Sequence, residues 1–205
     1  MDINGLNKYR FRDIYFEEDM FMRKYIIERD IIEGDEINKL DISLCYFKKT
    51  TMNYVVFDKM EVIDSVFENC DLSNSRFQFS SNVRVTFKNC KMLGCDFSDS
   101  YFSECIFENC DLSYANFSMS HFKGSTFRNC RFIEADLIEC KLLKTKFESS
   151  ELIRVNFNST KLNKIDFSSN IIVGLGANPE DIYGCKMSSA HVEVLAGMLG
   201  VEIVG

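Results

Sequence analysis

FENCDLS occupies residues 67–73 of the chain and appears again, unchanged, at residues 107–113. Two related stretches, FKNC at 87–90 and FRNC at 127–130, extend the series, so that the pattern Phe-x-Asn-Cys begins at 67, 87, 107 and 127. A constant interval is typical of proteins whose repeats stack on one another. A shorter period inside this interval gives the shape of each repeat.

A large apolar residue stands at every fifth position from 42 to 172, with Asn82 as the sole exception. The position two residues earlier is mostly small, and this set of positions holds eight of the nine cysteines. Residues two apart point to the same side of an extended backbone, so each unit of five has two inward and three outward residues. Four such units match the interval between copies of Phe-x-Asn-Cys. They close a square coil, and equivalent side chains then stack about 4.8 Å apart.

Sorting the inward positions by side predicts two facing walls of phenylalanine with aliphatic residues between them, which suits a narrow, close-packed interior. The asparagines of the motif fall at a corner, where Asn tolerates turn geometry. The pattern is therefore the signature of a coil, and no catalytic role is assigned to it. The predicted core ladder is Phe67, Phe87, Phe107 and Phe127, and the small-residue column is Cys70, Cys90, Cys110 and Cys130.

The stretches CDLSN (70–74), CDFSD (95–99), CDLSY (110–114), YANFS (114–118) and EADLI (134–138) resemble the pentapeptide-repeat proteins. The resemblance covers about residues 42–172. It implies an all-β fold, the right-handed quadrilateral β-helix, which agrees with the square coil derived from the residues alone. We expect this β-helix over 42–172, followed by a short C-terminal helix.

Both ends of such a rod need caps, because an exposed strand edge invites uncontrolled pairing. Residues 1–41 keep only traces of the pattern, and we expect a degenerate first coil or an N-terminal cap there. Residues 173–205 form the predicted C-terminal cap. Ser188 or Ser189 can begin a helix in this cap, Gly200 can end it, and VEIV at 201–204 is the expected strand.

The tail, GCKM followed by a short helix and LGVEIVG, resembles the C-terminus of the Qnr-type quinolone-resistance proteins and their DNA-mimicking relatives. This resemblance implies a non-enzymatic protein that binds a type II topoisomerase, DNA gyrase or topoisomerase IV, and protects it from quinolones. The alternative is a scaffold for another protein partner. The helix is too short to be stable alone, so we expect a homodimer joined through its apolar residues and the strand: Val194, Leu195, Met198, Leu199, Val201 and Ile203.

No arrangement of residues indicates catalysis, a cofactor or a metal site. His121 and His191 are isolated in the sequence, and both are expected at the surface. The cysteines point inward and no signal-like segment precedes them, which favours reduced thiols in a cytoplasm, although stacked pairs have backbones close enough for a disulfide. No stretch of about 18 apolar residues indicates a membrane span.

Because the net charge is −7, we do not expect the chain to bind nucleic acid directly. The charge is uneven along the rod, because residues 57–113 carry 5 basic and 10 acidic side chains, whereas residues 114–165 carry 9 and 5. Three outward apolar residues, Leu93, Ile133 and Ile153, share one side. They indicate either a contact surface or a surface over which residues 171–187 fold back.

Overall fold

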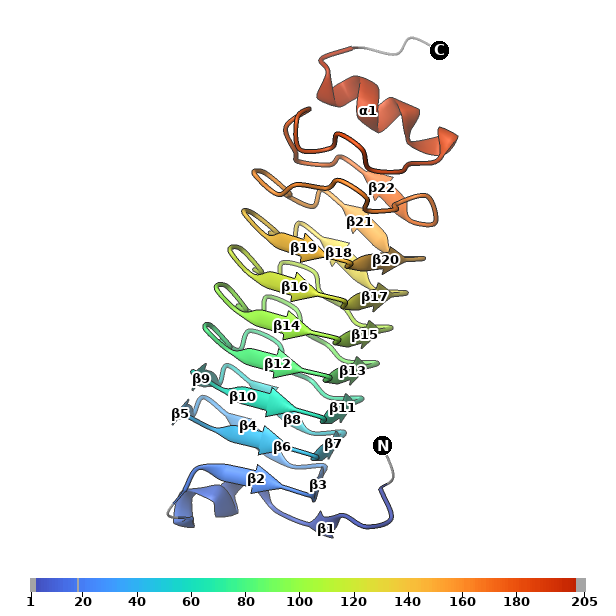
Figure 1. Cartoon of the computed structure of the whole chain (residues 1–205). Helices are drawn as coiled ribbons and strands as arrows, with labels where there is room; N and C mark the ends of the chain where they lie inside the picture. The colour runs from blue at the N-terminus through green and yellow to red at the C-terminus, as the bar shows by residue number, and fades with distance from the viewer. Residues whose placement is uncertain (1–2, 18, 202–205) are drawn as a thin grey trace.

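The computed structural model describes residues 3–17 and 19–201. The chain forms a parallel β-solenoid of about eight coils, with a cap at each end (Figure 1). We call the four sides A, B, C and D after their inward residues: Phe67 lies on side A, Leu72 on side B, Phe77 on side C and Val62 on side D. Each coil repeats the four sides in the same order. The predicted four-sided β-helix with a short C-terminal helix is confirmed.

The strands are short and pair in parallel with the equivalent strands of the neighbouring coils, as in Phe67 with Phe87 and Val62 with Asn82. Sides A and D form the two long sheets. Sides B and C have fewer strands, and where strands are missing, single bridges connect one coil to the next within each side. Side A contains β1 (Asn7–Lys8), β3 (Tyr25–Glu28), β7 (Tyr46–Lys48), β11 (Val66–Glu68), β13 (Thr86–Lys88), β15 (Ile106–Glu108), β17 (Thr126–Arg128) and β20 (Lys146–Glu148). Side D contains β2 (Phe21–Arg23), β6 (Asp41–Ser43), β10 (Glu61–Ile63), β12 (Ser81–Val83), β14 (Tyr101–Ser103), β16 (His121–Lys123) and β19 (Lys141–Leu143). Side B contains β4 (Ile31–Glu33), β8 (Thr51–Asn53), β18 (Arg131–Ile133), β21 (Glu151–Ile153) and β22 (Ile171–Val173), and side C contains β5 (Glu36–Asn38) and β9 (Val56–Asp58).

The corners are made by left-handed backbone. Every fifth residue from Lys24 to Lys164 has a positive φ, and only three of these residues are glycine. Asparagine is the residue that tolerates this conformation best after glycine, which explains the asparagines of the repeated motif. They also form a ladder, because the amide of Asn109 donates to Asn89 (3.0 Å) and that of Asn89 to Asn69 (3.4 Å).

The core is a double column of phenylalanine rings. On side A, neighbouring rings from Phe47 to Phe147 are stacked with centroids 4.6–5.1 Å apart. Side C provides the facing column, and Phe107 meets Phe117 edge-on at 6.3 Å. Phe67, Phe87, Phe107 and Phe127, the residues of the predicted ladder, are all buried.

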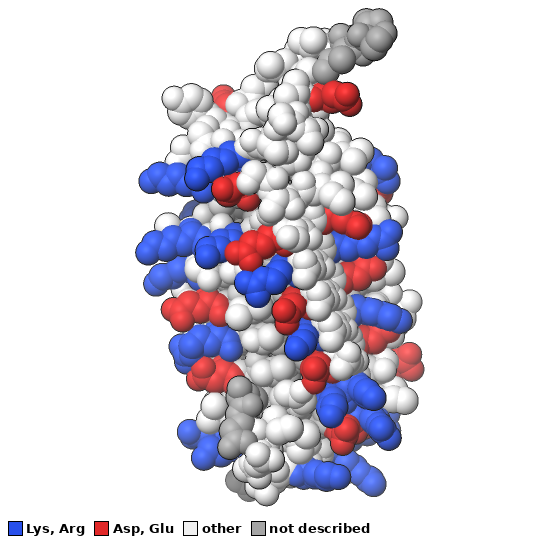
Figure 2. Space-filling model, turned by 90° about the vertical axis from the view of Figure 1, so that its right-hand side faces the viewer, with Lys and Arg blue, Asp and Glu red and all other residues white. Residues whose placement is uncertain are grey.

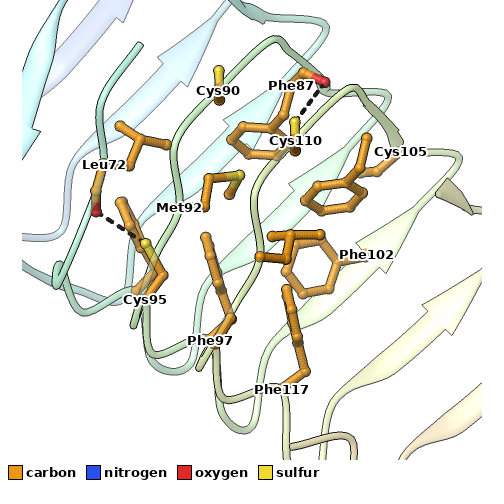
Figure 3. Packing of buried hydrophobic residues seen from close by; sticks show 14 of the residues in the cluster. Leu72, Phe87, Cys90, Met92, Cys95, Phe97, Phe102, Cys105, Cys110 and Phe117 are labelled. Carbon is orange, nitrogen blue, oxygen red and sulfur yellow. Dashed lines mark hydrogen bonds between the residues drawn. The ribbon is translucent and has the colours of Figure 1, made fainter. Parts of the chain in front are cut away.

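The small inward residues also serve as hydrogen-bond donors. The thiol of Cys110 donates to the carbonyl of Phe87 (3.4 Å), and that of Cys95 donates to the carbonyl of Leu72 (2.9 Å; Figure 3). Ser120 and Thr160 bond in the same way to carbonyls of the preceding coil. These small polar side chains thus add hydrogen bonds between the inward carbonyls of one coil and the next.

The first complete coil begins earlier than the clear sequence pattern. Within the predicted 1–41 segment, Met22, Ile27, Ile32 and Ile37 are buried in register with the coil that follows. The residues two before them are large or charged instead of small, because no coil lies below. They contact an N-terminal cap instead, formed by residues 3–17 with a 3-10 helix at Phe11–Phe16.

The N-terminal cap is held by polar and aromatic contacts. The Asp30 carboxylate accepts the backbone N–H of Phe11 (2.6 Å), and Asp35 accepts the hydroxyl of Tyr15 (2.9 Å). Tyr9 stacks on Tyr25 at 4.2 Å. The cap therefore covers the open end of the phenylalanine columns.

The C-terminal cap consists of a 3-10 turn at Ser189–His191 and helix α1 (Val192–Met198) at the top of Figure 1. Ser188 begins the turn through a capping box, and Gly200, at φ 72°, follows the helix. The expectation that His191 lies at the surface is wrong. Its side chain is buried, and its Nε2 lies 3.0 Å from the carbonyl oxygen of Asn170, which ties the cap to the last coil. The predicted strand at 201–204 lies almost wholly outside the described residues.

Asn82, the one polar residue in the large-residue series, is fully buried. Its amide donates to Ser80 (2.9 Å), but its Oδ1 has no partner. Leucine has nearly the same shape, so we expect Asn82→Leu to raise the free energy of unfolding by about 1–2 kcal/mol. Urea denaturation measures this change.

The matched control is Val62→Asn, one coil earlier on side D, which should lower the free energy of unfolding by about 2–4 kcal/mol. A destabilised Asn82→Leu variant would show that the buried amide contributes to stability.

Candidate functional site

Sides A and B carry charges that alternate from one coil to the next. On side A the series is Glu28, Lys48, Glu68, Lys88, Glu108, Arg128 and Glu148. Ion pairs join Lys88 to Glu108 (3.8 Å) and Arg128 to Glu148 (2.9 Å). On side B, Arg131 lies between Asp111 and Glu151 at 3.8 and 3.7 Å. The alternation is visible along the face in Figure 2, and it leaves little net charge on these two sides.

Side C has a different charge pattern. Between residues 96 and 159, this side and its following corner carry Asp96, Asp99, Asp136 and Glu139, and they carry no lysine or arginine. We call these four residues the acidic side. Strands β5 and β9 of side C lie at the left edge of Figure 1. This face therefore carries part of the excess of acidic residues that gives the chain its charge of −7.

Asparagines keep the carboxylates of the acidic side apart. Asn116 lies in the coil between Asp96 and Asp136, and its amide donates to Asp96 (3.1 Å). Asn156 does the same for Asp136 (3.0 Å). Asp96 also accepts the backbone N–H of Ser98 (3.0 Å), so part of its role is to hold the turn. Asp99 and Glu139 are exposed corner residues.

Exposed apolar residues border the acidic side. Phe79 and Met119 occupy the same corner as Asp99 and Glu139 and are 57% and 49% exposed. Tyr54 and Tyr114 are exposed at the opposite corner of side C. Large exposed apolar residues beside a charged surface are the composition of a protein-binding face. Sorting the outward positions coil by coil could have found this face from the sequence.

The three residues predicted as an outer patch lie elsewhere, on side B. Ile133 pairs in register with Ile153, and Ile153 pairs with Val173. Ile133, Ile153 and Val173 therefore form a continuous column. Leu93 is separated from them by Ser113. Residues 171–173 continue the coil as β22 and do not fold back over the column, although Ile133 and Ile153 are only partly exposed.

The residues predicted for dimerisation fall into two groups. Val194 and Met198 pack against the core, with Leu195 partly buried. Leu199 and Val201 are exposed, as is Val192. The helix therefore places Val194 and Met198 on the last coil and leaves Val192 and Leu199 exposed. Ile203 lies outside the described residues.

The cysteines have the environment of structural thiols. Eight of the nine are buried, and Cys185 is partly exposed. Burial raises the pKa of Cys105 and Cys140 to about 12, and it also raises the pKa of Cys95. A thiol that stays protonated is a poor nucleophile and metal ligand. Within residues 3–17 and 19–201, no cluster of metal-binding side chains occurs, and no helix is long and apolar enough to cross a membrane.

Comparison with known proteins agrees with this architecture. Residues 80–157 match the family model of the pentapeptide repeat region. Among solved structures, a trypsin-treated form of QnrB1, a plasmid-mediated fluoroquinolone resistance protein, is 20% identical and has a TM-score of 0.61, covering 87% of this chain and 90% of its own. Full-length QnrB1 is 19% identical with a TM-score of 0.53, covering 95% of each chain. No curated protein matches the sequence. Residues 80–157 thus match the pentapeptide repeat region, and the chain as a whole shares the fold of QnrB1.

The burial of the thiols predicts their reactivity. In native protein at about pH 8, we expect an aromatic disulfide reagent to modify no more than one thiol rapidly, that of Cys185, because only this side chain is partly exposed. Absorbance of the released thiolate measures the count, and unfolding in guanidinium should expose all nine.

A Cys185→Ser variant should lose the rapid phase. Rapid modification of three or more thiols in the native protein would contradict the buried columns.

Proposed function

We propose that this protein acts by binding, without catalysis, and that its acidic side occupies the DNA-binding surface of a type II topoisomerase. Bound there, it would protect DNA gyrase or topoisomerase IV from quinolones. The single observation that carries the proposal is the acidic side itself, a face with carboxylates and no cations over residues 96–159. Type II topoisomerases work on chromosomal DNA, so the proposal places this protein in the cytoplasm.

The spacing of the carboxylates suits mimicry of a DNA backbone. Asp96 and Asp136 lie two coils apart, which is roughly 10 Å along the rod at about 4.8 Å per coil. The four carboxylates of the acidic side belong to this span. Duplex DNA carries about six phosphates over the same length, at about one per 1.7 Å. The densities are similar in magnitude, so a basic groove that accepts DNA can also attract this face.

The Qnr-like fold supports the proposal through the shape of the molecule, because a straight rod can lie in a groove made for a duplex. QnrB1 is described as a fluoroquinolone resistance protein. The exposed Phe79 and Met119 supply apolar contacts that DNA lacks, and these would let the protein bind without being displaced by salt alone.

A supercoiling assay with DNA gyrase tests the proposal. Titration of the protein should inhibit supercoiling or restore it in the presence of ciprofloxacin. The double variant Asp99→Lys, Glu139→Lys reverses two exposed charges of the acidic side, so we expect it to need about a tenfold higher concentration for the same effect.

The matched control is Glu61→Lys, Glu104→Lys, which makes the same change of net charge at exposed positions of side D and its following corner. This control should behave as the native chain. Absence of both inhibition and protection at micromolar concentrations would refute the topoisomerase proposal.

A second candidate function is a scaffold for another protein partner. The observation that favours it is the apolar column of Ile133, Ile153 and Val173 on side B, whose neighbouring charges alternate and cancel. Such a face fits a near-neutral protein surface better than a DNA-binding groove. Failure of the supercoiling assay would leave this candidate.

We also propose that two chains join through their C-terminal caps. Val192, Leu199 and Val201 are more than half exposed at the end of the rod, and a twofold axis would cover the same patch on both chains. Light scattering should give the mass of a dimer at tens of micromolar. Leu199→Glu should give a monomer with folded coils, because the side chain is 66% exposed and its change leaves the core intact.

The control is Phe16→Glu, at the most exposed apolar position of the N-terminal cap, which should remain dimeric. A monomeric native chain would refute the end-to-end dimer.

A further inference from the structure

The stack of coils opens at one place. Throughout the preceding coils, backbone hydrogen bonds join sides A and D to the next coil, as from Lys141 to Ser120 (3.0 Å) and from Lys146 to Ser125 (3.0 Å). Among the described residues, no backbone hydrogen bond joins 141–149 to 161–168. β19 and β20 are accordingly the last strands of their sheets. Sides B and C stay closed at this level, since Ile171 bonds to Ser150 and Phe157 to Gly176.

The opening has a local cause at the corner between sides A and B. Ser169 is the first corner residue after Lys164, and it lacks the positive φ of the earlier corners. Asn170 replaces the small cysteines of its column. Its larger side chain bridges the coils by accepting the N–H of Ser150 (2.9 Å) and donating to the carbonyl of Phe147 (2.9 Å). Asn170 thus acts as a spacer, and the rings of Phe147 and Phe167 are tilted by 35° instead of stacked.

A cleft of about 590 Å³ lies in this opening, and its lining includes Lys144, Thr145, Lys146, Glu148, Lys164 and Asp166. Its two acids are already engaged: Glu148 pairs with Arg128 (2.9 Å), and Asp166 accepts the hydroxyl of Ser168 (2.6 Å) and faces Lys186 (3.8 Å). Within the described part of the chain, the ammonium groups of its three lysines form no ion pair. The left side of the upper half of Figure 2 shows basic side chains gathered over this end of the rod.

Unsatisfied donors lie beside these lysines. The backbone N–H groups of Lys144 and Asp166 form no hydrogen bond in the described structure. The hydroxyl of Thr145 is buried, and it too has no partner, although equivalent serines in other coils donate to a carbonyl. A buried hydroxyl without a partner is rare in folded proteins. Three unpaired cations next to unpaired N–H and O–H groups are the complement of an oxyanion.

We propose that this cleft binds a compact, polyvalent oxyanion of the phosphate type. The tilt of the Phe147 and Phe167 rings marks a narrow opening, which favours a compact group over an added strand. Lys144, Lys146 and Lys164 supply the charge, and the N–H groups of Lys144 and Asp166 supply directed hydrogen bonds. The ligand is either free phosphate or pyrophosphate, or the phosphate end of a nucleotide. The site lies away from the acidic side and does not rest on the topoisomerase proposal.

Nuclear magnetic resonance of the ¹⁵N-labelled full chain tests the proposal. Inorganic phosphate, pyrophosphate and ADP are each titrated at constant ionic strength set with sodium chloride. We expect the amide signals of Lys144 and Asp166 to shift in a saturable way, with pyrophosphate bound more tightly than phosphate. Equal affinity for ADP and pyrophosphate would assign the site to the diphosphate group alone, and tighter binding of ADP would assign it to a nucleotide.

The variant Lys144→Ala, Lys164→Ala removes two ammonium groups. It should weaken binding at least about tenfold, because the loss of even one charge-assisted contact has an effect of this size. The control Lys39→Ala, Lys59→Ala removes two lysines that are likewise stacked one coil apart at left-handed corners, and it should bind as the native chain does. Equal thermal midpoints of the two variants would show that both are folded. Unsaturable shifts, or equal weakening in both variants, would overturn the proposal.

Discussion

The left-handed corner is the constraint on which the rest of the rod depends. One residue in five takes a backbone conformation that costs about 1–2 kcal/mol for most side chains, and it does so at 26 positions without glycine. The corner is tolerated because its N–H enters the ladder between coils, as Asn69 does with the carbonyl of Lys88 (2.9 Å). It also limits each side to one inward pair of residues. Side length, column spacing and the inward pattern all follow from this turn.

Because coils stack in register, each outward position becomes a column with its own chemistry. A change of residue type from one coil to the next is enough to give one face alternating charges, another face carboxylates, and a third free lysines. The core is built from the inward residues of each side and recognition from the outward ones, so folding and recognition place separate demands on the sequence. The acidic side and the lysine-lined cleft can therefore differ in sign within the same few coils, although the chain as a whole carries only a modest net charge.

The sequence predicts those parts of the fold in which residue size and period agree. The phenylalanine columns and the corners that bound them are predicted because both features hold there. The pattern is weak around Met22 to Ile37, because the residues two before them, such as Asp30 and Asp35, contact the N-terminal cap and not a lower coil. His191 was misjudged because its partner, the carbonyl of Asn170, comes from tertiary packing. The opening beside Phe167 is invisible to periodicity, since the large residues keep their step of five while the backbone bonds are lost.

The alternating charges explain why FENCDLS returns unchanged after two coils and not after one. The coil that follows each copy reads FKNCKML or FRNCRFI, with cations where Glu68 and Asp71 stand. A tandem copy of one coil would stack like charges on sides A and B, which destabilises neighbouring strands. A copy of two coils keeps every contact between opposite charges. A duplication within the gene can therefore lengthen the rod without stacking like charges only if it copies a pair of coils, roughly 10 Å of rod. The repeat of FENCDLS after two coils has the length of this unit.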